Sequence, residues 1–275
     1  EINKLIDLYN QGLFRDVISK SDDLIKEFPA EKFLVKLQGV CHLELKEFAL
    51  AEIKFQECLL LDKNDPEIFN NLGILFHRRS QFQKSLKNFT KAISLDKNYF
   101  NAFNNLGCLF RDYGLFDEAV KTFRDGLAIN QQNIELHQNL SHCLLITRQF
   151  ELGSKEYNWR WPIDHIIKNN TLLSSKNMWN GKDPNVRLLL WREQGLGDEI
   201  FFLNFLRNLR KKVKDIKVII DYRLKTMYER SFPEVTFYTE QKSITKDDFD
   251  FHLPIGNLIA SLYHHPDFLS YKSFP

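Results

Sequence analysis

The chain of 275 residues is long enough for one large domain or for two domains of ordinary size. Its 38 lysines and arginines nearly balance its 36 aspartates and glutamates, which excludes a bulk electrostatic attraction to nucleic acid or to an anionic membrane. No apolar segment approaches the roughly 20 residues that cross a bilayer, and no signal peptide is visible. The composition is that of a soluble globular protein.

The cysteines predict a reducing compartment and no metal centre. They form no CxxC pair and have no histidine at ligand spacing, so zinc is not expected. All four fall inside helical patterns and are expected to be small core residues of a cytoplasmic protein: Cys41, Cys58, Cys108 and Cys143. Because the chain starts at Glu1 without methionine and stops at Pro275 directly after an apolar segment, we expect it to be part of a longer protein.

The first half of the chain repeats at a step of 34 residues, as the alignment of NNLGILF at Asn70 with NNLGCLF at Asn104 shows. One aromatic column contains Phe14, Phe48, Phe82, Phe116 and Phe150. A second contains Phe55, Phe89, Phe123 and Tyr157. Between them runs a column of small residues, Ala51, Ser85, Ala119 and Gly153. This pattern predicts paired helices that approach closely at the small residues and fill the remaining space with the rings.

These columns resemble the tetratricopeptide (TPR) repeat. The resemblance covers Glu1 to about Arg160 in five units, and it implies an α-solenoid over residues 1–161 that binds a protein or peptide in the groove lined by the first helix of each unit. Lys97 and Gln131 depart from the family pattern where a boundary proline is expected. The first unit departs too, with Lys4-Leu5 in place of Leu-Gly.

A column of asparagines predicts how the array would hold a peptide. It contains Asn71, Asn105 and Asn139, with Asn70 and Asn104 beside them. Each side-chain amide offers both a donor and an acceptor to the backbone of an extended peptide. The TPR domain of the protein O-GlcNAc transferases carries a similar ladder. The alternative is that asparagine is common at this position and stays solvated.

The pattern changes after Tyr157. Residues 162–185 are rich in Asn, Ser, Lys, Gly and Pro, and we expect them to form a linker. Beyond it, strand-like runs alternate with helical stretches, which predicts a parallel sheet and a Rossmann-like α/β domain over residues 186–275. The expected strands are Val186–Trp191, Ile216–Tyr222, Val235–Glu240 and Phe249–Ile255, and the first expected helix is Glu199–Lys212.

The turn EQGLGD, which follows the first of these strands, is a poor phosphate site. Gly195 and Gly197 begin a G-x-G-x-x-G fingerprint, but Ile200 stands where the third glycine belongs. We expect Asp198 to be the helix N-cap, where its carboxylate would compete with a phosphate for the same N–H groups. The turn therefore suits a carboxylate held near a hydroxyl.

Three segments carry a second resemblance. Trp179–Gly181 (WNG), Leu188–Ile200 and Phe249–Pro254 (FDFHLP) look like the domain that follows TPR arrays in bacterial TPR glycosyltransferases. That domain is similar to the heptosyltransferases, which have the GT-B fold of two Rossmann domains. The resemblance implies that this chain carries the N-terminal, acceptor-side half of a GT-B enzyme. The parent protein would then use a sugar nucleotide as donor substrate, with no tightly bound cofactor and no metal.

Within that resemblance, Leu196, Gly197 and Asp198 match the triplet whose aspartate is regarded as the base that activates the acceptor hydroxyl. Such a base contributes on the order of 10²- to 10⁴-fold to the rate. Five neighbours are expected to bind the acceptor: Glu193, Gln194, Gly195, Gly197 and His252. For Glu193 and Gln194, the alternative is that they orient Asp198. The alternative for Asp198 is plain helix capping, and a structural role is the alternative for His252.

Two functions follow. The first is a TPR glycosyltransferase whose array selects the acceptor; this chain alone should then be inactive, because it ends before a donor-binding domain. The second is a non-catalytic TPR interaction scaffold with a degenerate α/β domain.

Overall fold

The computed structural model describes residues 1–28, 31–160, 163–193 and 195–262, without the side chains of residues 163–165. The chain divides into two compact units, Glu1–Cys143 and Leu144–Pro275. Each unit has its own hydrophobic cores, and each is described here by itself.

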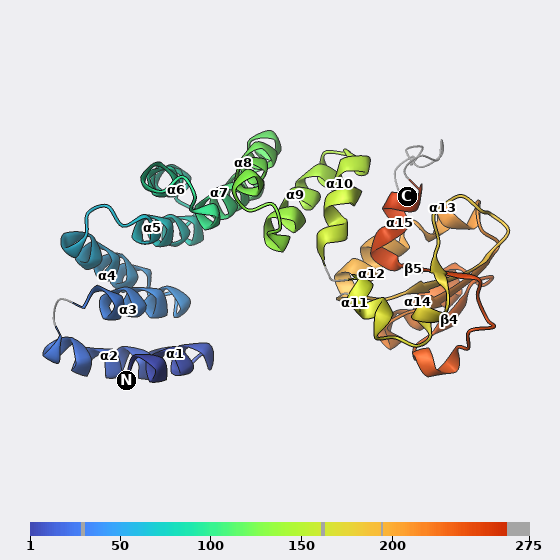
Figure 1. Ribbon diagram of the computed structural model, residues 1–275, viewed down its shortest axis with the longest axis horizontal. Coiled ribbons are helices and arrows are strands. Elements are labelled where there is room, and N and C mark those ends of the chain that lie inside the picture. The colour runs from blue at the N-terminus through green and yellow to red at the C-terminus, as the bar shows by residue number, and fades with distance from the viewer. Residues whose placement is uncertain (29–30, 161–162, 194, 263–275) are drawn as a thin grey trace. The chain divides into compact units, whose positions relative to one another are not determined.

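The first unit is a row of helix pairs, coloured blue to green in Figure 1. Its helices are α1 (Ile2–Asn10), α2 (Phe14–Glu27), α3 (Lys32–Glu44), α4 (Phe48–Leu61), α5 (Pro66–Arg78), α6 (Phe82–Leu95), α7 (Phe100–Asp112), α8 (Phe116–Ile129) and the start of α9 (Ile134–Ile146). Successive pairs pack through α2 with α3, α4 with α5, and α6 with α7. The predicted helical repeat is therefore confirmed.

A phenylalanine ring packs against a glycine in three of the pairs, α3–α4, α5–α6 and α7–α8. The rings of Phe55, Phe89 and Phe123 are fully buried, and they lie over Gly39, Gly73 and Gly107. A Cβ atom at Gly73 would come within 2.4 Å of the Phe89 ring. The small-residue column is buried as predicted, and the Ser85 hydroxyl donates a hydrogen bond to the Gly73 carbonyl at 2.8 Å. Glycine is thus required in the first helix so that the ring of the second can approach.

The first pair exchanges the large and the small residue. Leu5 stands in the glycine column and Ser21 in the phenylalanine column, and both are buried. The total side-chain volume is therefore kept near that of the other pairs, which explains why the unit folds although its sequence departs from the pattern.

A left-handed residue joins the two helices of every pair. These residues recur at the 34-residue step: Gly12, Lys46, Ser80, Gly114 and Arg148. The hydrogen bonds are those of a Schellman motif; for example, the Ser80 N–H donates to His77 O and the Gln81 N–H to Phe76 O, each at 2.8 Å. The sequence indicates this turn only where the residue is glycine.

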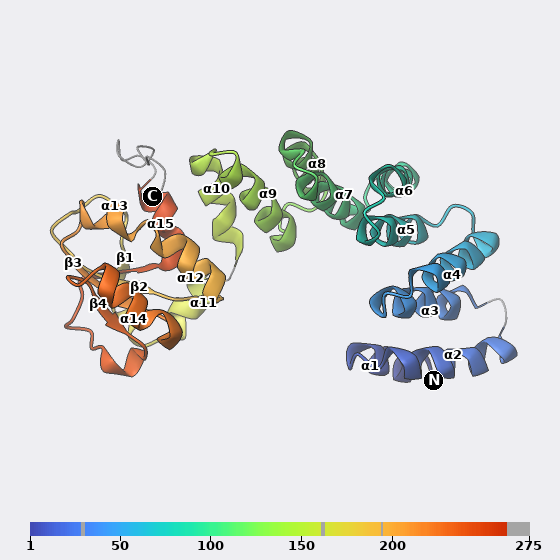
Figure 2. The same ribbon diagram turned by 180° about the vertical axis from the view of Figure 1, so that it is seen from behind.

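The second unit is a five-stranded parallel sheet with helices on both faces (Figure 2). Its strands are β1 (Asn177–Met178), β2 (Arg187–Trp191), β3 (Asp215–Ile219), β4 (Thr236–Tyr238) and β5 (Phe251–Pro254), in the spatial order β1-β5-β2-β3-β4. Its helices are the end of α9, α10 (Phe150–Tyr157), η1 (Asn158–Arg160), α11 (Ile163–Lys168), η2 (Leu173–Ser175), α12 (Leu196–Leu203), α13 (Leu206–Arg210), α14 (Tyr222–Ser231), η3 (Gln241–Ser243), η4 (Ile255–Asn257) and α15 (Leu258–Leu262). Strand β2 pairs with β5 through Leu189 and His252.

Alternate residues of each strand enter two separate cores. Leu188 and Leu190 of β2 face the larger core, to which α10, α12, α13, α14 and α15 contribute. Leu189 and Trp191 face the smaller core, where they pack with residues around α11 and η2. The predicted parallel sheet is confirmed, and its assignment to half of a GT-B enzyme stays a prediction.

Two predicted boundaries differ from the structure, the end of the array and the linker. Helix α10, expected to close the array, packs in the second unit because Tyr157 is buried in the core of the sheet. The expected linker of residues 162–185 contains α11, η2 and β1, and β1 is paired with β5. Strand β1 could not be predicted, because two residues are too few to show the period of two that marks a strand.

The first helix of the α/β domain also differs from expectation. It begins at Leu196 rather than Glu199 and is divided at Asn204 and Phe205 into α12 and α13. The four predicted strands are each shorter than expected by one to three residues, as is usual for boundaries set by packing.

Candidate functional site

Hydrogen bonds join the asparagines of neighbouring repeats within the first unit. The Asn105 amide on α7 donates to Asn70 Oδ1 on α5 at 2.9 Å. One repeat further along, the Asn139 amide on α9 donates to Asn104 Oδ1 on α7, also at 2.9 Å. The asparagines therefore bind one another, and their predicted contact with a peptide backbone stays a prediction.

These bonds divide the asparagines into two groups. Asn70 and Asn104 are buried and accept, so they hold neighbouring first helices together. Asn105 and Asn139 are half-buried. Since an amide has two N–H donors and an oxygen with two lone pairs, each keeps hydrogen-bonding capacity after the bridge is made. Asn71 occupies the equivalent position on α5 and is 9% exposed.

Charged residues of both signs flank this row. His77 Nε2 lies 3.2 Å from Asp112 Oδ2, and Arg111 Nη1 donates to Asn139 Oδ1 at 2.7 Å. On the other side, Lys36 Nζ bonds Glu67 at 2.5 Å and the Asn104 amide bonds Glu135 at 2.8 Å. Because the charges are paired, the row favours contacts to neutral peptide groups over capture of one sign of charge.

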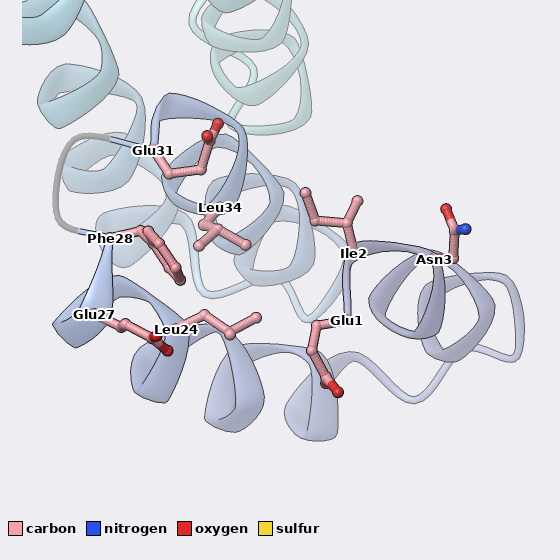
Figure 3. Close-up of a pocket in the computed structure, with 8 residues that line it drawn as sticks. All are labelled: Glu1, Ile2, Asn3, Leu24, Glu27, Phe28, Glu31 and Leu34. Atoms are coloured by element: carbon pink, nitrogen blue, oxygen red, sulfur yellow. The ribbon is translucent and has the colours of Figure 1, made fainter.

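The first unit also has an open cavity of about 610 Å³ at its first helices (Figure 3). Its floor is apolar, with Leu24, Phe28 and Leu34, and the carboxylates of Glu27 and Glu31 stand at its rim. Ile2 at the start of α1 closes one side.

In the second unit, the predicted site lies where the strand order reverses. Strands β2, β3 and β4 follow one another outward, and β5 returns to the other side of β2. Open parallel sheets bind ligands at the carboxyl ends of the two strands that flank such a reversal. Here those ends are Glu193, after β2, and Gly256, after β5.

A buried ion pair fills this position. Arg160 Nη2 lies 2.5 Å from Glu193 Oε1, and the two side chains are 0% and 3% exposed. The same nitrogen donates to Asn257 Oδ1 at 2.7 Å, and the Gly256 N–H donates to Glu193 Oε1 at 3.1 Å. The Arg160 guanidinium lies over the Tyr157 ring, 4.1 Å from its centroid. The chain thus places its own cation where a ligand would be expected.

Tyr157 is buried beside charged residues of both signs. Burial raises the pKa of Tyr157 well above its ordinary value; Arg160 opposes the rise, and the charges of Asp198 and Glu193 add to it. Its ring packs against Phe202, with centroids 5.1 Å apart. The tyrosine therefore stays a neutral hydroxyl throughout the physiological range.

Asp198 and Glu193 line one small cavity with Tyr157 and Gly256. Its volume is about 10 Å³, which is room for one water molecule and too little for a sugar. The prediction that Asp198 is the N-cap is wrong. Gly195 is the N-cap, because its carbonyl accepts from the N–H groups of Asp198 and Glu199 and places the aspartate in the first turn. There its charge still favours the helix dipole.

A second ionic cluster follows at the ends of β2 and β3. Glu199 accepts from the Asp221 N–H at 2.9 Å and lies 2.8 Å from Arg192 Nε. Burial raises the pKa of Glu199, whereas hydrogen bonds from Arg223 hold the pKa of Asp221 far below its usual range. Asp221 also caps α14 through the Arg223 N–H. This cluster joins α12 to α14, and that structural role accounts for its charged residues.

Three further predicted acceptor-binding residues, Gly195, Gly197 and His252, do not line the cavity beside Asp198. The predicted position of His252 at this edge of the sheet is wrong. Its side chain faces the smaller core, where Nδ1 accepts a hydrogen bond from Trp191 Nε1 at 3.1 Å. Burial lowers the pKa of His252. Gly195 and Gly197 are exposed, with no atoms near the place of a Cβ. Gln194 lies outside the described residues.

Sequence reasoning missed Tyr157, Arg160 and Gly256. Tyr157 and Arg160 fall in the helical repeat pattern, which predicts a place in the array and not beside the sheet. Gly256 was the only available signal: a glycine directly after a strand often marks close approach of other groups. A Cβ there would lie 2.7 Å from Arg160 Nη2 and from Glu193 Oε1.

Other site types find no support in the described ranges. Among those residues, no three His, Cys, Asp or Glu side chains are grouped to hold a metal ion. No helix within them is long and apolar enough to span a membrane. The predicted burial of the cysteines is confirmed for Cys41, Cys58 and Cys143, and burial raises the pKa of the partly buried Cys108 to about 11.

Known proteins share the repeat. The family model of the tetratricopeptide repeat matches residues 100–133, which contain α7 and α8. Protein FlbA of Caulobacter vibrioides is 30% identical over 102 residues, which cover 30% of this chain and 17% of FlbA. The chain therefore matches less than a fifth of that relative's length.

Two solved structures share the fold. The structure of pilF from Pseudomonas aeruginosa has a TM-score of 0.56 at 13% identity, covering 84% of this chain and 90% of pilF. A chain of the APC/C hetero-tetramer Cut9-Hcn1 has a TM-score of 0.51 at 20% identity, covering 62% of this chain and 34% of its own. This chain is therefore a mostly helical TPR-like solenoid with a small parallel sheet in its C-terminal part.

Proposed function

We propose that this chain, a TPR repeat protein, is an interaction scaffold whose array holds an extended peptide segment of a partner protein along α5, α7 and α9. The observation that carries the proposal concerns Asn105 and Asn139. Each donates a hydrogen bond to the neighbouring repeat and keeps further hydrogen-bonding capacity for a peptide. A peptide backbone presents N–H and C=O groups at regular intervals, which such a row can meet. Assembly of the same fold in the Cut9-Hcn1 hetero-tetramer supports a scaffold role.

The bridges have a further consequence for binding. Each Asn to Asn hydrogen bond fixes one rotamer of the donor before a peptide arrives. Holding the donors in place lowers the entropy that is lost on binding. The donor side chains of the array are therefore ordered before the peptide binds.

The proposal is tested by panning a phage-displayed library of random peptides on the immobilised chain. Selected peptides are expected to bind the wild type and to lose affinity for the variant Asn71→Ala, Asn105→Ala, Asn139→Ala. Asn88→Ala is the matched control, since the Asn88 amide on α6 bonds Lys84 O of its own helix. No enrichment on the wild type, or equal binding by the triple variant, contradicts the proposal.

One further variant separates binding from folding. Asn70→Ala removes the acceptor of the bridge but leaves the Asn105 amide in place. We expect a stability loss of about 1 kcal/mol or more, because the Asn105 donor loses its partner, with the peptide affinity reduced less than in the triple variant.

A second function rests on a different observation: Asp198, Glu193 and Tyr157 share a cavity at the reversal of a parallel sheet. We propose that the parent protein is a glycosyltransferase of the GT-B type, in which this sheet is the acceptor-side Rossmann half. Asp198 would accept the proton of an acceptor hydroxyl, and a sugar nucleotide would bind elsewhere in the parent. The comparisons lend this proposal no support, and the scaffold is the better supported function.

Asp198→Asn tests the catalytic role in the full-length protein, assayed with a panel of sugar nucleotides. Because Asp198 is not the N-cap, the amide should leave the stability nearly unchanged while abolishing transfer. Transfer retained by the variant would exclude Asp198 as the base. A cytoplasmic location, which would keep the four thiols reduced, is part of the same proposal.

A further inference from the structure

Helix α4 carries an apolar face that the second helices α2, α6 and α8 lack. Leu50, Ile53, Leu60 and Leu61 are 47%, 52%, 79% and 49% exposed. In the 34-residue register, Leu50 corresponds to Asp16, Lys84 and Glu118, and Ile53 to Ser19, Lys87 and Lys121. Helices α2, α6 and α8 therefore carry polar residues at both positions, although Leu152 of α10 stands in the Leu50 column, and the apolar side chains of α4 are not required by the fold.

The charges beside this face are symmetric along the helix. Lys54 and Glu57 form an ion pair at 3.0 Å, and both are partly exposed. The pair Lys54 and Glu57 has the same midpoint as the pair Leu50 and Leu61, between Phe55 and Gln56. A two-fold axis through that midpoint aligns two antiparallel copies of α4 so that Leu50 of each copy is level with Leu61 of the other. Lys54 of each is then level with Glu57 of the other.

We propose that this face of α4 binds α4 of a second copy of the chain, forming an antiparallel two-fold dimer. Such an interface is self-complementary: each copy offers the same apolar patch and one charge of each sign. The pairing removes the exposed leucines from water and places Lys54 and Glu57, which already pair within each helix, opposite the complementary charge of the other copy. Because the patch lies on a second helix, dimerisation leaves the asparagine row on the first helices to bind peptide.

Sedimentation velocity of the chain over a range of concentrations tests the proposal. The wild type is expected to show a monomer–dimer equilibrium. Leu50→Lys, Ile53→Lys, Leu60→Ser introduces the residues that α6 carries at these positions, Lys84, Lys87 and Ser94. The association constant should fall by more than about tenfold, with an unchanged circular dichroism spectrum.

Two single variants test the antiparallel pairing and alter only partly exposed charges. Lys54→Glu gives a chain with glutamate at both positions 54 and 57, and Glu57→Lys gives a chain with lysine at both. Each alone should dimerise less than the wild type, and their mixture should form the heterodimer in preference to either homodimer. A wild type that is monomeric at every concentration, or a mixture with no preference, overturns the proposal and leaves the face to another partner.

Discussion

At the scale of single residues, the second unit depends on a buried contact among Arg160, Glu193 and Gly256. The ion pair is almost fully removed from water, so it must be well bonded to persist. Gly256 supplies both an N–H donor and the space that the guanidinium occupies. The contact joins η1 to the ends of β2 and β5.

Gly256→Ala should lower the free energy of unfolding of the second unit by about 1 to 3 kcal/mol, because the new methyl would overlap three groups. Urea unfolding followed by tryptophan emission measures this directly, since all four tryptophans follow Cys143. Gly197→Ala is the control: it has open space and lies in a helix, where alanine is favoured. Equal stability of the two variants would show that the crowding at Gly256 is absent.

A second residue-scale prediction concerns acid. Hydrogen bonds from Arg187 lower the pKa of Asp250 to about 2 from an ordinary value of 3.8. The pair therefore stabilises the fold above about pH 4, and this contribution is lost as the pH falls toward 2. The stability difference between wild type and Asp250→Asn should shrink over that interval. A difference that is independent of pH would contradict this assignment.

At the scale of elements, the helix pairs of the array share one turn geometry, and three of them share the contact of a phenylalanine ring with a glycine. The left-handed position costs about 1 kcal/mol for a residue with a Cβ, so three of the five turns are held by their surroundings. Gly114→Ala should destabilise the array by about that amount, as measured by far-UV circular dichroism in urea. Lys46→Gly should not destabilise it, although glycine usually does. If Gly114→Ala is neutral, the turn is not under strain.

The repeat could be predicted from the sequence because its spacing is local and its ring and small-residue columns are strict. The turn column could not, since Lys46, Ser80 and Arg148 carry no signal for a left-handed conformation. The sheet and most of its strands followed from apolar runs. The site at its edge did not, because Arg160 and Glu193 are brought together only by packing, and because His252 shares a strand with Leu253 but faces the opposite core.

At the scale of the whole molecule, the chain combines two surfaces on different helices of one array. The asparagine row lies on first helices, and the proposed dimer face lies on a second helix. A dimer would present two peptide sites, so a partner with two binding segments would gain avidity without any new contact. The α/β unit adds a domain whose ligand position is filled by Arg160.

The most direct test of the account is whether the array recognises the backbone of its peptide. A peptide selected on the wild-type chain is resynthesised with N-methyl groups at alternate backbone nitrogens, and its Kd is measured by isothermal titration calorimetry. If the asparagine amides bind the backbone, each lost hydrogen bond should weaken binding by about 2- to 12-fold. An unchanged Kd in every methylated peptide would contradict the proposed role of the asparagine row.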